Sequence, residues 1–124
     1  MLSVKISEKN LIAILEPDGP LSESDFQSLA NAVDPLIEKF GRLNGILIHT
    51  KSFPGWESFT AFYSHLRFVK NHHKNISRIA LVTDSLMGML AESVVSHFIK
   101  AEIRLFAYQD YAKANEWVIG NEQK

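Results

Sequence analysis

The apolar residues of this chain switch repeatedly between the two-residue period of a β-strand and the 3.6-residue period of an α-helix. Strand-like spacing covers residues 2–6, 11–15, 45–48, 79–82 and 103–107. Helical spacing covers residues 22–40, 57–73, 87–99 and 112–118. Two strands come first, and a helix separates each later strand from the next. The order ββαβαβαβα therefore predicts an α/β fold, with a mixed, mostly parallel sheet flanked by helices.

Size and composition limit the class of protein. The chain has 124 residues, so we expect one domain over residues 1–124. Without cysteine it can form no disulfide, thiolate metal site or cysteine nucleophile. Its first residues lack the features of a signal peptide, and no apolar run is long enough to span a bilayer, which predicts a cytoplasmic protein with at most peripheral contact at the inner membrane surface. A net charge of −1 argues against nucleic-acid binding.

The first helical segment carries clear signals for its two ends. Ser22 is a suitable N-cap, and Gly41 follows the last apolar residue of the pattern. Pro35 lies inside the pattern, where it removes a backbone donor. We therefore expect the helix to bend there or its first part to end near Val33.

The second helical segment is aromatic and basic, with no acidic residue between Glu57 and Asp84. Helical spacing places five of its apolar residues, Phe59, Phe62, Tyr63, Leu66 and Val69, on one face and Phe68 about 180° away. Together with the preceding loop, these residues predict the lining of an apolar ligand pocket: Phe53, Trp56, Phe59, Phe62, Tyr63 and Leu66. A second set predicts a membrane-facing surface, with cations for anionic headgroups and one phenylalanine for insertion: Arg67, Phe68, Lys70 and Lys74.

Other interpretations remain open for the same region. The apolar stripe is equally typical of a helix face packed in the core. The histidines of this helix are expected to be solvated and to bind no metal, because the adjacent His72 and His73 point about 100° apart. Ser52, Ser85, His49 and Asp84 follow buried strands and leave a hydrolase conceivable, although no Gly-x-Ser-x-Gly motif accompanies them.

Three segments carry a resemblance to a known family. They are the strand Gly45-Ile-Leu-Ile-His49, the loop Phe53-Pro-Gly-Trp56 and the strand end Ile79-Ala-Leu-Val-Thr-Asp84. With these segments and its element order, the chain resembles the SpoIIAA-like family of small bacterial proteins. That family is similar to STAS domains and to the lipid-carrying Sec14/CRAL-TRIO fold. The resemblance implies binding of an apolar ligand or association with membranes, without enzymatic activity or a cofactor.

The chain departs from the STAS regulators at their phosphorylation motif. They carry Asp-Ser-Ser/Thr-Gly after the third strand, where this chain has His49-Thr-Lys-Ser-Phe-Pro-Gly-Trp56. No aspartate precedes Ser52, which makes phosphorylation there doubtful. We therefore expect non-enzymatic binding of an apolar or lipid-like small molecule, with reversible association with an anionic membrane. The alternative is a STAS-type protein-interaction module. The open edges of so small a sheet are compatible with a homodimer.

Overall fold

The computed structural model describes residues 2–52, 55, 59–84 and 102–120. The expected third helix, residues 87–99, lies outside these ranges. Several side chains between residues 59 and 73 are also outside the described part: Phe59, Thr60, Phe62, Tyr63, Leu66, Val69 and His73.

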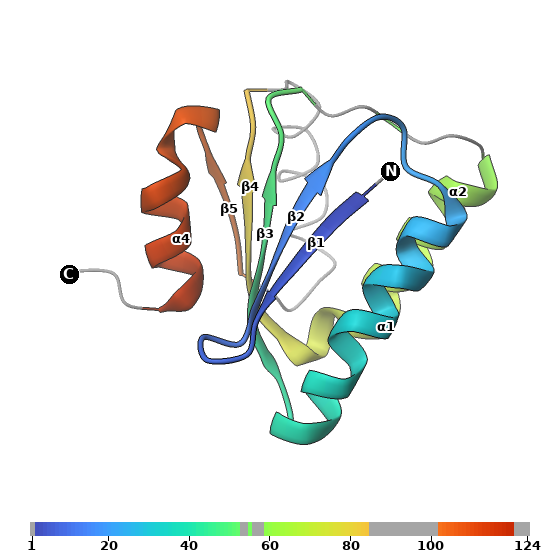
Figure 1. The fold of residues 1–124 in the computed structure, drawn as a ribbon, viewed down its shortest axis with the longest axis horizontal. Helices are drawn as coiled ribbons and strands as arrows, with labels where there is room; N and C mark the ends of the chain where they lie inside the picture. The colour runs from blue at the N-terminus through green and yellow to red at the C-terminus, as the bar shows by residue number, and fades with distance from the viewer. Residues whose placement is uncertain (1, 53–54, 56–58, 85–101, 121–124) are drawn as a thin grey trace.

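A twisted sheet forms the middle layer of the described structure (Figure 1). Its strands are β1 (Leu2–Ser7), β2 (Ile12–Pro17), β3 (Leu43–His49), β4 (Ile76–Val82) and β5 (Glu102–Phe106). They lie side by side in chain order. The β1–β2 pair is antiparallel, and the other three pairs are parallel. The predicted mixed, mostly parallel sheet is therefore confirmed.

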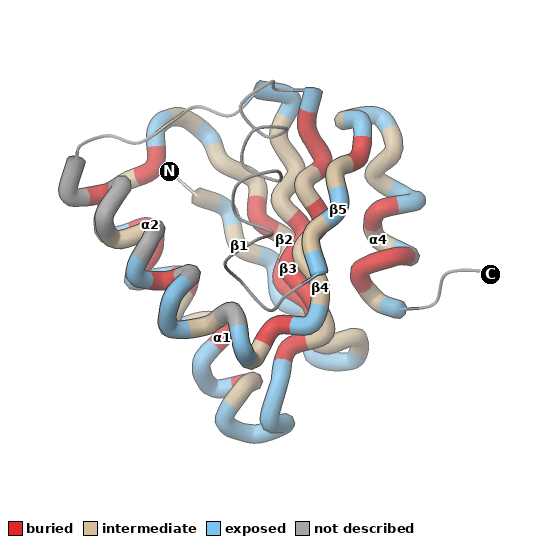
Figure 2. The backbone as a smooth tube through the Cα atoms, turned by 180° about the vertical axis from the view of Figure 1, so that it is seen from behind, coloured by how far each residue is buried: buried red, intermediate tan, exposed pale blue. Residues whose placement is uncertain are grey.

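Helices flank this sheet on both sides (Figures 1 and 2). The described helices are α1 (Glu23–Phe40), α2 (Phe59–His72) and α4 (Tyr111–Ile119), with 3₁₀ turns η1 (His73–Asn75) and η2 (Tyr108–Asp110). The α1 and α2 helices lie next to each other on one side, and α4 covers the opposite side. None of the described helices is both long enough and apolar enough to cross a membrane.

The central strands β2 and β3 have buried residues on both faces, which divides the core into two layers. Ala13 and Ile46 face α1, where they join Leu29 and Val33 in one cluster. The alternate strand residues face α4 in a second cluster: Ile12, Leu47, Ala80 and Val82. Because successive side chains of a strand point to opposite faces, one apolar strand supplies both layers. This explains why β3 has a short apolar run rather than an alternating pattern.

The α1 helix has its N-cap at Ser22 and its C-cap at Gly41, as expected, and it is continuous through Pro35. Ser22 and Asp25 form a capping box: the Asp25 amide donates to Ser22 Oγ at 3.2 Å, and the Ser22 amide donates to Asp25 Oδ2 at 2.8 Å. The helix then continues through Pro35 to Phe40. Of the two effects expected from Pro35, a bend or an end near Val33, the second is wrong. Buried residues on both sides of Pro35, Val33 and Leu36, hold the helix on the sheet, which offsets the missing backbone hydrogen bond.

Candidate functional site

One face of α2 is packed on α1. The residues of this face are Ala61, His65, Phe68 and His72, which follow one another at helical spacing. Phe68 is 9% exposed and belongs to the core cluster that contains Phe26 and Leu29. The expectation that Phe68 lies on the outer face for membrane insertion is therefore wrong. Its helix packs beside α1, so the face that spacing alone assigned to solvent is closed by a second helix.

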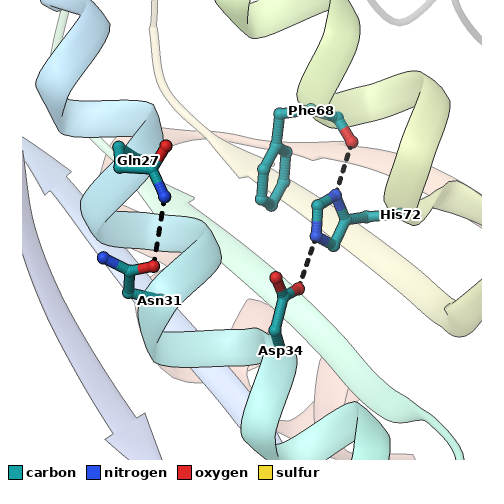
Figure 3. Close-up of polar contacts among 5 residues, drawn as sticks. All are labelled: Gln27, Asn31, Asp34, Phe68 and His72. Carbon is teal, nitrogen blue, oxygen red and sulfur yellow. Dashed lines mark hydrogen bonds and ion pairs between the residues drawn. The ribbon is translucent and has the colours of Figure 1, made fainter.

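His72 makes two hydrogen bonds at the end of this face (Figure 3). Its Nε2 lies 2.7 Å from Asp34 Oδ1 on α1, and its Nδ1 lies 2.8 Å from the carbonyl oxygen of Phe68. The imidazole also stacks on the Phe68 ring, with 4.0 Å between the ring centroids. The His72 side chain is only 12% exposed. The expectation of a solvated histidine is therefore wrong at this position, since a carboxylate and an aromatic ring from two helices enclose it.

His65 contacts α1 about two helical turns before His72. Its ring stacks on Phe26, with a centroid distance of 5.0 Å and an angle of 14° between the planes. Desolvation by burial lowers the pKa of His65 from the ordinary 6.5 to about 4. The contact between the helices therefore contains one histidine that burial keeps neutral.

This burial predicts a loss of stability in mild acid. The pKa of His65 is lowered on folding, so the unfolded chain takes up the proton first, and stability falls as pH drops from about 6.5 towards 4. We expect His65 to lower the free energy of unfolding by roughly 2 kcal/mol between pH 7 and pH 5. Urea titrations of the wild type and His65→Gln at both pH values measure the part of this loss that His65 causes. An equal fall in the free energy of unfolding from pH 7 to pH 5 in both proteins would contradict the prediction.

The opposite side of the α2 region carries exposed cations. We call Arg67, Lys70 and Lys74 the cationic stripe; the first two lie on α2, and Lys74 lies in η1. All three are exposed, and none forms an ion pair within the part of the chain that the structure describes. No acidic residue lies in α2 or η1 to neutralise them. Their predicted role requires this exposure, and the role itself stays a prediction.

The described side chains do not include the residues predicted to line the apolar ligand pocket. Phe53 and Trp56 lie outside the described residues. Phe59, Phe62, Tyr63 and Leu66 belong to α2, but their side chains are outside the described part. The apolar pocket therefore stays a prediction.

A second polar cluster lies where β2 and β3 end. His49 Nδ1 is 3.2 Å from Glu16 Oε2, and the imidazole stacks on Tyr108 with 4.4 Å between the ring centroids. Tyr111, at the start of α4, meets the same ring at 4.7 Å and 56°. The hydrogen bond from His49 is the main cause that lowers the pKa of Glu16 below 4.5, and Lys5 adds to it. The carboxylate thus fixes the orientation of the imidazole.

The neighbouring polar residues have structural partners. Asp84 Oδ1 accepts the Tyr108 amide at 3.0 Å, and Thr83 Oγ1 donates to the Lys51 carbonyl at 3.2 Å. Ser52 is exposed, and within the described contacts neither His49 nor Asp84 reaches it. The hydrolase hypothesis gains no support from Ser52, and Ser85 lies outside the described residues. Within the described ranges, no group of three or more potential metal ligands occurs.

Sequence reasoning found part of this cluster and missed the rest. It placed His49 and Asp84 at the carboxyl ends of central strands, where they lie. It did not pair His49 with Glu16, and it assigned no role to Tyr108 or Tyr111. The available signal was that Glu16 comes just before the end of β2, which is the parallel neighbour of β3.

The β-hairpin start, the parallel strands and the helices on both sides define a STAS-like α/β domain. The SpoIIAA-like family model matches residues 12–119, so the chain belongs to the SpoIIAA-like family. A similar solved structure is an uncharacterized protein of the DUF3478 family with a SpoIIAA-like fold, from Shewanella loihica PV-4. It is 19% identical with a TM-score of 0.73, over 95% of this chain and 92% of that one. No curated protein matches the sequence.

Proposed function

We propose that this protein is a non-enzymatic binding module that associates reversibly with an anionic membrane surface and takes up an apolar or lipid-like ligand. The observation that supports membrane association is the cationic stripe. Three exposed cations follow one another within eight residues, and none of them pairs with an acid among the described residues, in a chain whose net charge is −1. Such a local excess of positive charge favours an anionic surface over a neutral one.

The electrostatic contribution is modest. Each basic residue near an anionic leaflet contributes about 1 kcal/mol, so the stripe contributes roughly 3 kcal/mol. Phe68 is buried and adds no insertion energy. Association through this surface should therefore be weak, reversible and strongly reduced by salt, because exposed charges are screened within about 8 Å at physiological ionic strength.

The apolar ligand rests on a separate argument. The six residues predicted to line the pocket run from Phe53 to Leu66, next to the cationic stripe in the sequence. A lipid-like molecule has an apolar body and, in many cases, an anionic head, so it matches an apolar lining beside a cationic rim. The experiment for this part is extraction of lipid from the purified protein, followed by mass spectrometry.

Reversing two charges of the stripe should abolish vesicle binding. In Lys70/Lys74→Glu, two attractive contacts are lost, so binding to phosphatidylserine-containing vesicles should weaken by at least about 30-fold. The matched control is Lys9/Lys113→Glu, which changes the same number of exposed lysines elsewhere; neither lysine forms an ion pair with another described residue. Each Lys→Glu substitution lowers the net charge by 2, so the two substitutions in either variant take it from −1 to −5. Cosedimentation at low and physiological salt measures the difference.

Three outcomes would contradict membrane association. The wild type could fail to bind anionic vesicles, both variants could lose binding equally, or neither could lose it. Absence of vesicle binding, together with retention of an acidic protein in a lipid-free pulldown that Lys70/Lys74→Glu prevents, would favour the protein-interaction module instead.

A further inference from the structure

The two groups that hold the His72 ring can both act only as acceptors. One is the backbone carbonyl of Phe68, and the other is the carboxylate of Asp34 (Figure 3). A hydrogen bond to each requires a hydrogen on each ring nitrogen. The two contacts, 2.8 Å at Nδ1 and 2.7 Å at Nε2, can therefore both be hydrogen bonds only when the ring is an imidazolium.

We propose that His72, Asp34 and the Phe68 carbonyl form a pH-dependent latch between α1 and α2, closed when the imidazole is protonated and weakened when it is neutral. A histidine changes its charge between about pH 5 and pH 8. The latch lies in the last turn of α2, where a cation is also favoured by the helix dipole.

A neutral ring cannot keep both contacts. With hydrogen on Nδ1, the bond to the Phe68 carbonyl remains, but the lone pair of Nε2 faces an Asp34 oxygen. With hydrogen on Nε2, the bond to Asp34 remains, and the lone pair of Nδ1 faces the carbonyl. Either tautomer places two acceptors less than 3 Å apart. Loss of one proton therefore replaces an attraction by a repulsion, and the end of α2 should loosen from α1.

Groups from both helices surround the ring. From α1, the charged group in contact with His72 is Asp34; Glu38, one turn further on, is exposed, and Lys39 pairs with Glu8 at 3.2 Å. From α2, the ring meets the face of Phe68. His65 lies two turns away and stacks on Phe26. The two histidines respond oppositely to acid, since burial opposes a proton on His65 and the latch requires one on His72.

The latch would also regulate the proposed membrane surface; this consequence rests on the proposed function. Lys70 lies two residues before His72, and Lys74 lies two residues after it. A closed latch fixes this part of the chain on α1 and so keeps the cations of the stripe in one arrangement. A preorganised set of charges binds with less loss of conformational entropy.

The direct test is the protonation state of His72, read from its imidazole ¹⁵N chemical shifts. We expect both nitrogens to carry hydrogen at pH 6 in the wild type, and one to be unprotonated at pH 8. Amide protection factors over residues 68–72, corrected for intrinsic exchange, should fall about fivefold over the same range. A nitrogen without hydrogen at pH 6, or protection that does not change, would overturn the latch.

Asp34→Asn is the matched variant. An asparagine amide can donate to the lone pair of a neutral ring, so this variant should keep α2 on α1 without a proton on His72. We expect its protection factors over residues 68–72 to be equal at pH 6 and pH 8. The same fivefold fall in the variant would show that another group causes it and would overturn the proposal.

Vesicle binding at the two pH values separates the latch from the proposed function. Weaker binding at pH 8 in the wild type, absent in Asp34→Asn, supports the regulatory role. If the ¹⁵N shifts and protection factors change as expected while vesicle binding stays constant, the latch stands and its link to the membrane is overturned.

Discussion

Replacing Trp117 by alanine is expected to lower the free energy of unfolding by about 4 kcal/mol. The side chain is 4% exposed and holds α4 on the sheet. Its ring meets Phe106 at a centroid distance of 5.8 Å and has the Arg78 guanidinium 5.0 Å above it. Alanine removes both ring contacts and leaves a cavity between α4 and the strands. Urea unfolding at pH 7 measures the loss.

Two controls show whether that loss comes from packing. Trp117→Phe keeps an aromatic ring and should recover more than half of the stability. Glu116→Ala, at the exposed neighbouring position, should change it by less than about 0.5 kcal/mol. A loss of less than 1 kcal/mol in Trp117→Ala would contradict the assigned role of α4 as one side of the core.

Gly45→Ala is expected to cost about 3 kcal/mol, because α4 leaves no space for one methyl group. A Cβ atom at this position of β3 would overlap Val118 Cγ2 and lie 2.9 Å from the Arg78 carbonyl oxygen and 3.1 Å from the Val118 carbonyl oxygen. Backbone atoms cannot rotate away as a side chain can, so the helix or the strand must shift. Thermal unfolding of the variant and wild type at pH 7 measures the cost.

A second substitution separates the two sources of this overlap. Adding Val118→Ala removes the side-chain collision but leaves both carbonyl oxygens in place. Relative to Val118→Ala alone, the added cost of Gly45→Ala should therefore be smaller than in the wild type but not zero. Full tolerance of alanine in the wild-type background would mean that α4 does not pack on β3 as described.

The layers of the fold were predictable because they follow from local patterns. Period-two and period-3.6 spacing gave the strands and helices, and the order of elements implied parallel neighbours. Ser22 marked the start of α1 because a capping box needs only residues three apart. The possible helix end near Val33 that Pro35 indicated does not occur, since the cost of proline is local whereas the packing of Val33 and Leu36 that offsets it is tertiary.

The orientation of α2 was not predictable from its own sequence. The helix has an aromatic stripe and, about 180° away, the face that contains His65, Phe68 and His72. Spacing separates these faces but does not say that α1 covers the second one. The partners of that face lie far away in sequence, since positions 34 and 72 are 38 residues apart. The same reason hid the pair of Glu16 and His49, which only the register of β2 with β3 brings together.

The most direct test of the proposed function is to find which residues meet the membrane. Amide resonances of the ¹⁵N-labelled protein would be compared with nanodiscs of neutral lipid and of lipid containing phosphatidylserine. We predict selective broadening with anionic discs for Arg67, Lys70 and Lys74, no such effect with neutral discs, and unchanged resonances over α4. Broadening centred on α4 or on the Glu16–His49 cluster, or no difference between the two lipids, would contradict membrane association through the cationic stripe.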